Sequence, residues 1–146
     1  MATLTATATS TAPARAFLLA VVTGDEPALR RLLDEDVWLR AMLVREVVER
    51  HDADEAVALF RGWFGTAHEV QVLHASTHLA ATREAVTYGL RLRPVWAPDV
   101  WHVIEQTGYI RIHDGRIRRI DLVCTGFVPE HDLPTAGGGA SRATHA

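Results

Sequence analysis

Lysine is absent from the 146-residue sequence, so arginine supplies all the basic side chains. The 15 arginines are scattered among 18 acidic residues, which leaves a net charge of −3 and no basic stripe of the kind that binds nucleic acid. The single cysteine, Cys124, excludes an internal disulfide and a zinc site built from thiolates. No apolar run approaches the ~20 residues that a membrane-spanning helix requires. We therefore expect neither nucleic acid nor a membrane as a partner.

The two ends of the chain differ in composition from its middle. Residues 1–11 are rich in alanine and threonine and lack the charged and apolar regions of a signal peptide, so we expect a disordered segment and a cytoplasmic location. Residues 129–146 are rich in proline, glycine and small residues, which predicts a disordered tail. Residues 12–128 are long enough for one domain with a core of its own.

Three helices are expected in the first half of the domain. The first begins near Ala12 and ends at Gly24, a residue suited to the left-handed conformation that stops helices. Asp25 can cap a short second helix over residues 27–33. Asp52 and Glu55 form a capping box at the start of a third helix, over residues 53–64.

Strands are expected over residues 37–44, 70–81, 85–93, 100–112 and 116–127, and residues 45–50 are ambiguous between strand and helical turn. Asp114-Gly115 supplies the positive φ of a tight hairpin between the last two. The order is α-α-β-α followed by four antiparallel strands. It predicts an α+β fold, in which three N-terminal helices cover one face of a curved antiparallel sheet shaped like a cone. Pockets in such cones are mostly apolar with a few polar groups.

Several segments carry a resemblance to a known family. Residues 14–18, 23–25 and 32–37, the helix entry at residues 50–53 with Phe60, and residues 114–117 resemble the nuclear-transport-factor-two-like superfamily, most closely its SnoaL-like polyketide cyclase group. The resemblance covers residues 12–127 and implies the cystatin-like α+β roll of that superfamily. Because this fold serves cyclases, isomerases, dehydratases, epoxide hydrolases and non-catalytic subunits, the resemblance implies a fold more than a reaction.

The catalytic motifs of individual family members match poorly. Phe17 stands where the resemblance to ketosteroid isomerases would place a tyrosine, and residues 40–42 offer no carboxylate where those enzymes have their base. The epoxide hydrolases would have an aspartate at Leu122, and Asp121 is one residue away. Scytalone-dehydratase-like enzymes use two histidines on neighbouring strands with tyrosines nearby, and His78, His102 and Tyr88 resemble that set loosely.

His102 is the first candidate for catalysis. Alternation along residues 102–112 places it on the same face as Gln106 and three isoleucines, which marks that face as buried. A histidine exchanges protons near neutral pH, and Gln106 could orient a substrate carbonyl. The alternative is a hydrogen-bonded core histidine and a glutamine that satisfies a loop backbone.

The second and third catalytic candidates depend on strand geometry. A two-residue loop between the expected strands 70–81 and 85–93 turns His74 and His78 outward and buries Leu73 and Leu79, whereas a three-residue loop over residues 82–84 turns both histidines into the cone. The outward arrangement is favoured, and no metal site is expected from these histidines. Asp121 lies among arginines and suits a surface ion pair, but a bulge at residues 118–119 could turn it inward to orient His102.

A group of aromatic residues is expected to line the pocket. Trp96 and Trp101 flank a loop that would lie at its mouth, and the remaining members are predicted to line its walls. These remaining members are Phe17, Trp38, Phe60 and Tyr88.

Two functions follow from these observations. The favoured one is an enzyme, without metal or other cofactor, that cyclises, dehydrates or isomerises a largely apolar polyketide- or terpenoid-like compound by acid–base chemistry at His102. The alternative is a non-catalytic ligand-binding or dimerising module, which the missing acids favour. Under either, Arg91, Arg93, Glu105, Tyr109 and Arg111 on the outer sheet face predict a homodimer through that face.

Overall fold

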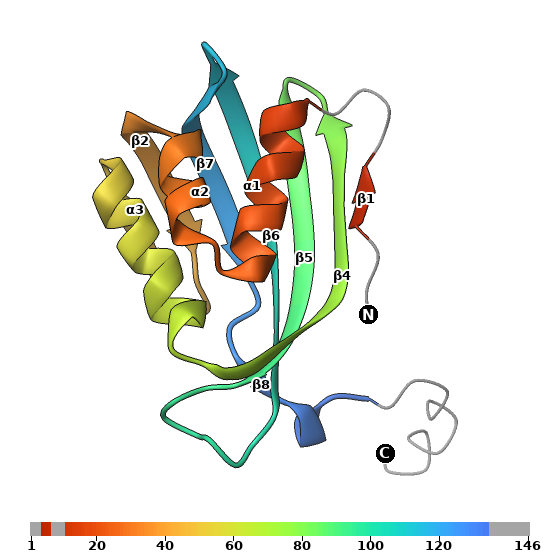
Figure 1. The fold of residues 1–146 in the computed structure, drawn as a ribbon. Helices are drawn as coiled ribbons and strands as arrows, with labels where there is room; N and C mark the ends of the chain where they lie inside the picture. The colour runs from red at the N-terminus through yellow and green to blue at the C-terminus, as the bar shows by residue number, and fades with distance from the viewer. Residues whose placement is uncertain (1–3, 7–10, 135–146) are drawn as a thin grey trace.

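The computed structural model describes residues 4–6 and 11–134, and it forms a curved sheet with three helices on one face (Figure 1). The helices are α1 (Ala12–Thr23), α2 (Glu26–Leu32) and α3 (Ala53–Phe60), which continues as the π-helical turn η1 (Arg61–Gly65). The strands are β1 (Leu4–Ala6), β2 (Leu33–Met42), β3 (Val47–Arg50), β4 (His68–Ala80), β5 (Arg83–Arg93), β6 (His102–His113), β7 (Arg116–Cys124) and β8 (Val128–Pro129). A short 3₁₀ turn, η2 (Glu130–Asp132), follows β8.

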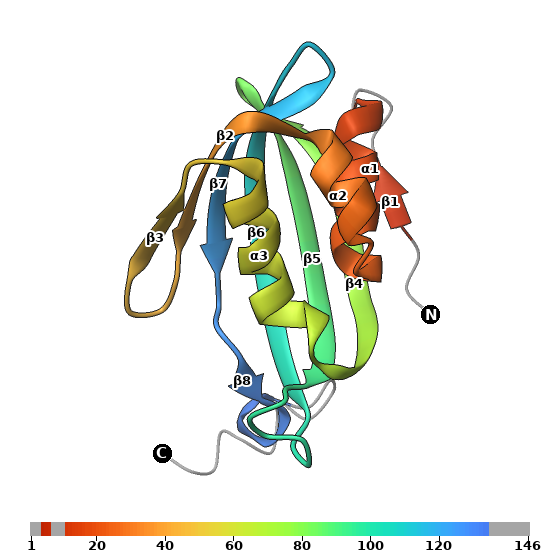
Figure 2. The ribbon, with the colours of Figure 1, turned by 60° about the vertical axis from the view of Figure 1, so that its left-hand side comes forward.

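The sheet is mixed, which corrects the expectation of a purely antiparallel one. Its order is β1-β4-β5-β6-β7-β2-β3, and β8 pairs with the start of β6. Strands β4 to β7 are antiparallel as predicted, but β2 pairs with β7 and β1 pairs with β4 in parallel. The parallel pair arises because α3 and η1 carry the chain from β3 across to β4, at the far side of the sheet (Figure 2). The last long strand then returns beside β2.

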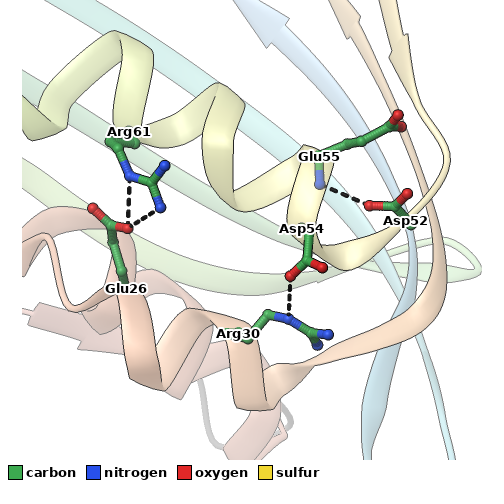
Figure 3. A network of polar contacts seen from close by, with 6 residues as sticks. All are labelled: Glu26, Arg30, Asp52, Asp54, Glu55 and Arg61. Atoms are coloured by element: carbon green, nitrogen blue, oxygen red, sulfur yellow. Dashed lines mark hydrogen bonds and ion pairs between the residues drawn. The ribbon is translucent and has the colours of Figure 1, made fainter.

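The helix ends follow the capping residues of the sequence. Gly24 has φ 68° and its N–H bonds back to the carbonyls of Ala20 and Val21, so α1 ends there as predicted. Asp25 accepts a hydrogen bond from the N–H of Ala28 and begins α2. At the start of α3, Asp52 accepts from the N–H of Glu55 at 2.7 Å (Figure 3). These local bonds satisfy N–H groups that an isolated helix end would leave unpaired.

Several boundaries differ from the sequence expectation. The ambiguous segment before residue 51 is strand β3, and β2 begins at Leu33, four residues earlier than expected. Leu4–Ala6 pair with β4, so disorder over the whole of residues 1–11 is not what the structure has. Residues 129–134 are likewise ordered at their start, where β8 pairs with β6 and Glu130 of η2 accepts hydrogen bonds from Arg91 of β5. The rest of both expected disordered segments lies largely outside the described residues.

The core lies between the helices and the inner face of the sheet. Val86, Tyr88, Leu90 and Leu92 of β5 alternate toward it as predicted, and all four are fully buried. Phe17 of α1 meets them from the helical side and packs edge-on against Phe60 of α3, with ring centroids 5.9 Å apart. Side chains thus fill the middle of the cone.

Candidate functional site

His102 is buried at the end of the cone that lies next to β8. It is the first residue of β6, pairs with Leu92 on one side and Pro129 on the other, and is only 3% exposed. Its Nδ1 lies 2.9 Å from the carbonyl oxygen of Val100. Because a carbonyl oxygen only accepts, Nδ1 carries the hydrogen, and in the neutral ring Nε2 is then an acceptor able to take a proton. Nε2 has no hydrogen-bond partner among the described residues.

Trp96 covers His102 from the loop at residues 94–101. The two rings meet edge to face, with centroids 4.9 Å apart, and Trp96 meets Phe127 in the same way at 5.9 Å. Trp96 is nevertheless 66% exposed. It therefore lies between the histidine and solvent, as a residue at the mouth of the cone would.

A second polar group lies deeper in the cone. The Tyr88 hydroxyl donates to Oε1 of Gln106 at 2.6 Å, and the Gln106 amide nitrogen donates to Sγ of Cys124 at 3.2 Å. Burial raises the pKa of Tyr88 well above its ordinary value, with a smaller contribution from Cys124, so the phenol stays neutral and can donate. Both ends of the Gln106 amide are therefore occupied within the protein, which leaves it poorly suited to orient a substrate carbonyl.

The two polar groups are too far apart to act together directly. His102 and Gln106 are separated by four residues on one strand, or ~13 Å at the usual rise per residue. The buried side chain of Ile104 lies between them. Of the two expected polar residues on this face of β6, His102 therefore acts without direct help from Gln106.

The other two expected catalytic residues lie on the outer face of the sheet. The loop after β4 has two residues, because Ala80 pairs with Arg83, and His78 is exposed. The outward arrangement is thus correct, but its stated reason is wrong: Leu73 and Leu79 are 46% and 53% exposed. The bulge between Val72 and His74 makes Leu73 the extra residue of β4, and Leu79 lies near the end of the strand, beyond the three residues that pair with β1.

Asp121 is held on the outer face by two arginines. Its Oδ2 lies 2.9 Å from Nη1 of Arg83 and 2.9 Å from Nε of Arg119. The bulge expected at residues 118–119 does occur. It places Ile117 and Ile120 on the inner face, however, and leaves Asp121 on the outer face. Asp121 is therefore a surface ion-pair residue and cannot orient His102.

The expected pocket aromatics divide between the two faces. Phe17, Phe60 and Tyr88 are buried in the core, Trp96 covers His102, and two tryptophans lie outside the cone. Trp38 stacks with His51 and lies against the guanidinium of Arg119, while Arg91 lies 3.8 Å over the ring of Trp101. The strand pattern of β2 predicts the position of Trp38, because Val37, Leu39 and Ala41 alternate with it and are buried.

Sequence reasoning missed a buried carboxylate at the opposite end of the cone. Glu84 of β5 is 8% exposed and accepts two hydrogen bonds from Thr11, from the backbone N–H at 2.6 Å and the hydroxyl at 2.7 Å. Thr11 in turn caps α1 through the N–H of Ala14. Glu84, Val86 and Tyr88 are two residues apart on one strand, so alternation could have predicted that Glu84 lies on the buried face. Glu84 anchors the first helix, and it lies a whole strand length away from His102.

Four pockets formed by the described residues lie away from His102. A cleft of about 30 Å³ runs between the α1–α2 turn and η1, lined by Val21, Leu29, Phe60 and Phe64. The ion pair of Glu26 and Arg61 stands at its rim, and together with Arg30–Asp54 it joins α2 to α3 (Figure 3). Three wider grooves lie on the surface. None of these four is lined by His102.

Residues 4–6 and 11–134 contain no cluster of three or more histidine, cysteine or acidic side chains suited to a metal ion. Within the same residues, no helix is long and apolar enough to span a bilayer.

Comparison with known proteins identifies the fold. No protein-family model and no curated protein matches the sequence. Among solved structures, a candidate polyketide cyclase from Xanthomonas campestris is 16% identical, with 76% of this chain and 86% of that one covered and a TM-score of 0.62. An NTF2-like protein from Burkholderia xenovorans is 13% identical, covering 77% and 86%, at 0.60. An LEH-like epoxide hydrolase from M. tuberculosis is 17% identical, covering 77% and 79%, at 0.55. The chain therefore has the α+β cone fold of the nuclear-transport-factor-two-like proteins, as its motifs predicted.

Proposed function

We propose that this protein is a cofactor-independent enzyme that acts on a small, largely apolar molecule of the polyketide or terpenoid class, with His102 as its acid–base group. The observation that carries the proposal is the setting of His102: a buried imidazole whose Nδ1–H is fixed on the Val100 carbonyl. A ring held in one orientation, with its other nitrogen unpaired, is prepared to remove and return a proton.

The reaction class follows from what one such group can do. Cyclisation, dehydration and isomerisation of carbonyl compounds each require a proton to be taken from one atom and a proton to be delivered to another. A histidine can perform both transfers in turn, because it exchanges protons near neutral pH. Asp121 and His78 take no part in this proposal, since both lie on the outer face.

The substrate class follows from the surroundings of His102. The ring of Trp96 packs on His102, Phe127 packs on Trp96, and Leu92 pairs with His102 across the sheet, so we expect a compound that contacts Nε2 to meet apolar surface on its other sides. Trp96 packs on the imidazole, and because Trp96 is 66% exposed, little buried surface opposes its movement when a ligand binds there. We keep the expected cytoplasmic location as part of this proposal.

The test replaces His102 by asparagine. The side-chain amide of Asn can donate toward the Val100 carbonyl much as Nδ1 does, but it cannot take a proton. With a panel of polyketone and terpenoid substrates followed by mass spectrometry, we expect His102→Asn to lower turnover about 10²–10⁴-fold, the usual share of a general acid–base group. His78→Asn on the outer face is the matched control and should leave turnover unchanged. Equal turnover for His102→Asn and the unmodified protein would contradict the proposal.

The second candidate function is a non-catalytic, dimerising module. The specific observation in its favour is the outer face of the sheet, where Arg83, Arg91 and Arg93 lie over the rings of Tyr109 and Trp101 and leave a broad surface of charges and aromatic rings. Such surfaces suit contact with a second copy of the chain. Analytical ultracentrifugation at micromolar concentration should give the mass of a dimer. A monomer mass would remove the homodimer from both candidate functions.

A further inference from the structure

A bulge in β7 brings three arginines to one rung of the sheet. Ile112 of β6 pairs with Ile117 of β7, but the next residue of β6, Arg111, pairs with Arg119, so Arg118 is the extra residue. Ile117 and Ile120 are both buried, which turns the two consecutive arginines between them toward the outside. In an unbulged strand, successive side chains point to opposite faces. The bulge thus places two arginines of β7 opposite one arginine of β6.

The charge of this cluster is only partly neutralised. Arg119 pairs with Asp121 through two nitrogens and lies over the ring of Trp38. Arg111 and Arg118 have no ion-pair or hydrogen-bond partner in the part of the chain that the structure describes. Like charges placed opposite each other on neighbouring strands destabilise a sheet. An anion between these guanidinium groups would relieve that repulsion.

The cluster lies in a groove of the size that a small ligand needs. The groove has a volume of about 550 Å³ and is lined by all three arginines together with Asp36, Trp38, Ile112 and His113. His113 lies 3.3 Å from Asp114, so that imidazole already has an acidic partner. Asp36 is the one carboxylate that lines the groove. Its negative charge repels an anion, so replacing Asp36 by a neutral residue should strengthen anion binding.

We propose that this groove binds the phosphate group of a small molecule through Arg111 and Arg118, with Arg119 as a fixed positive wall. Guanidinium groups present planar pairs of N–H donors that match the oxygens of a phosphate. The Trp38 ring already contacts the guanidinium of Arg119 and stacks with His51, so we assign recognition to the oxyanion and not to aromatic stacking.

The groove is separate from the site proposed around His102. Arg111 follows His102 by nine residues on β6, or ~30 Å along the strand. The two sites lie at opposite ends of the sheet, since β8 pairs with the start of β6 and the β6–β7 hairpin closes its other end (Figure 2). Binding in the groove can therefore be tested without any substrate of the enzyme, and its failure would leave the proposal for His102 untouched.

The test measures binding of inorganic phosphate and of phenyl phosphate by isothermal titration calorimetry in a low-salt buffer free of other oxyanions. We expect Arg111→Gln and Arg118→Gln each to weaken binding about tenfold or more, because each removes a charge-assisted hydrogen bond. Asp36→Asn should strengthen binding. Arg45→Gln is the matched control, since Arg45 is an exposed arginine in the β2–β3 turn, away from the groove. Unchanged melting temperatures would show that the variants remain folded.

The location of binding is read from the side-chain Nε–Hε signals of arginine in ¹⁵N-labelled protein. Phosphate should move the signals of Arg111 and Arg118 and leave that of Arg45 in place. Equal affinity for the two probes would assign binding to the oxyanion alone, and tighter binding of phenyl phosphate would assign a share to Ile112; either supports the site. No heat or signal shift at millimolar phosphate, or equal weakening by Arg45→Gln, would overturn it.

Discussion

Replacing Tyr88 by phenylalanine tests whether the polar chain inside the cone is structural. The substitution removes one hydroxyl from a fully buried ring and leaves Oε1 of Gln106 without its donor at 2.6 Å. A buried acceptor left unpaired costs about 1–3 kcal/mol. For a chain of this size, that loss corresponds to a fall in melting temperature of about 3–9 °C. Adding Gln106→Leu removes the orphaned acceptor, so the double variant should recover much of the loss.

Urea unfolding followed by tryptophan fluorescence measures these differences, and the alkaline range adds a second reading. Burial holds the pKa of Tyr88 above the ordinary value of 10.0, so above that pH the unfolded chain releases a proton that the folded chain keeps. Stability must therefore fall as pH rises past 10, with Tyr88 adding up to about 1.4 kcal/mol per pH unit to the slope. Tyr88→Phe should lack this contribution. An unchanged stability, strictly additive losses in the double variant, or an unchanged alkaline slope would refute the assignment.

Two further predictions concern the ends of the cone. Glu84→Ala should expose the first turn of α1 to faster amide hydrogen exchange and cost about 1–2 kcal/mol, because Thr11 loses both hydrogen bonds to the carboxylate; protection equal to the unmodified protein would count against the anchor. At the other end, the Arg91 guanidinium hydrogen-bonds Glu130 and holds the pKa of that carboxyl below its ordinary value of 4.5. This Arg91–Glu130 ion pair should persist from neutral pH down to about the ordinary pKa and be lost as pH falls through the lowered pKa of Glu130. In Glu130→Gln it should be absent at all pH values. Limited proteolysis of the loop at residues 94–101 measures this, and equal cleavage of the two proteins at neutral pH would contradict it.

The helix ends could be predicted from sequence because they depend on neighbouring residues. Gly24 stops α1, and Asp25 and Asp52 cap the helices that follow, through bonds that span three or four residues. The inward face of β6 could also be predicted, because alternation requires only that the segment be a strand. These patterns were sufficient for the α+β cone and for the burial of His102.

The register of the strands and the partners of the polar side chains could be known only from the tertiary structure. Whether Asp121 faced inward depended on which residue of β7 is the extra one at the bulge, and the answer came from the burial of Ile117 and Ile120 against the helices. The parallel pairing of β2 with β7 joins segments about 80 residues apart, which no local pattern specifies. Local chemistry therefore determined the elements of this protein and their buried faces. Long-range packing alone decided which polar side chains meet, because those contacts join residues that are distant in the sequence and are fixed only when the sheet closes on the helices.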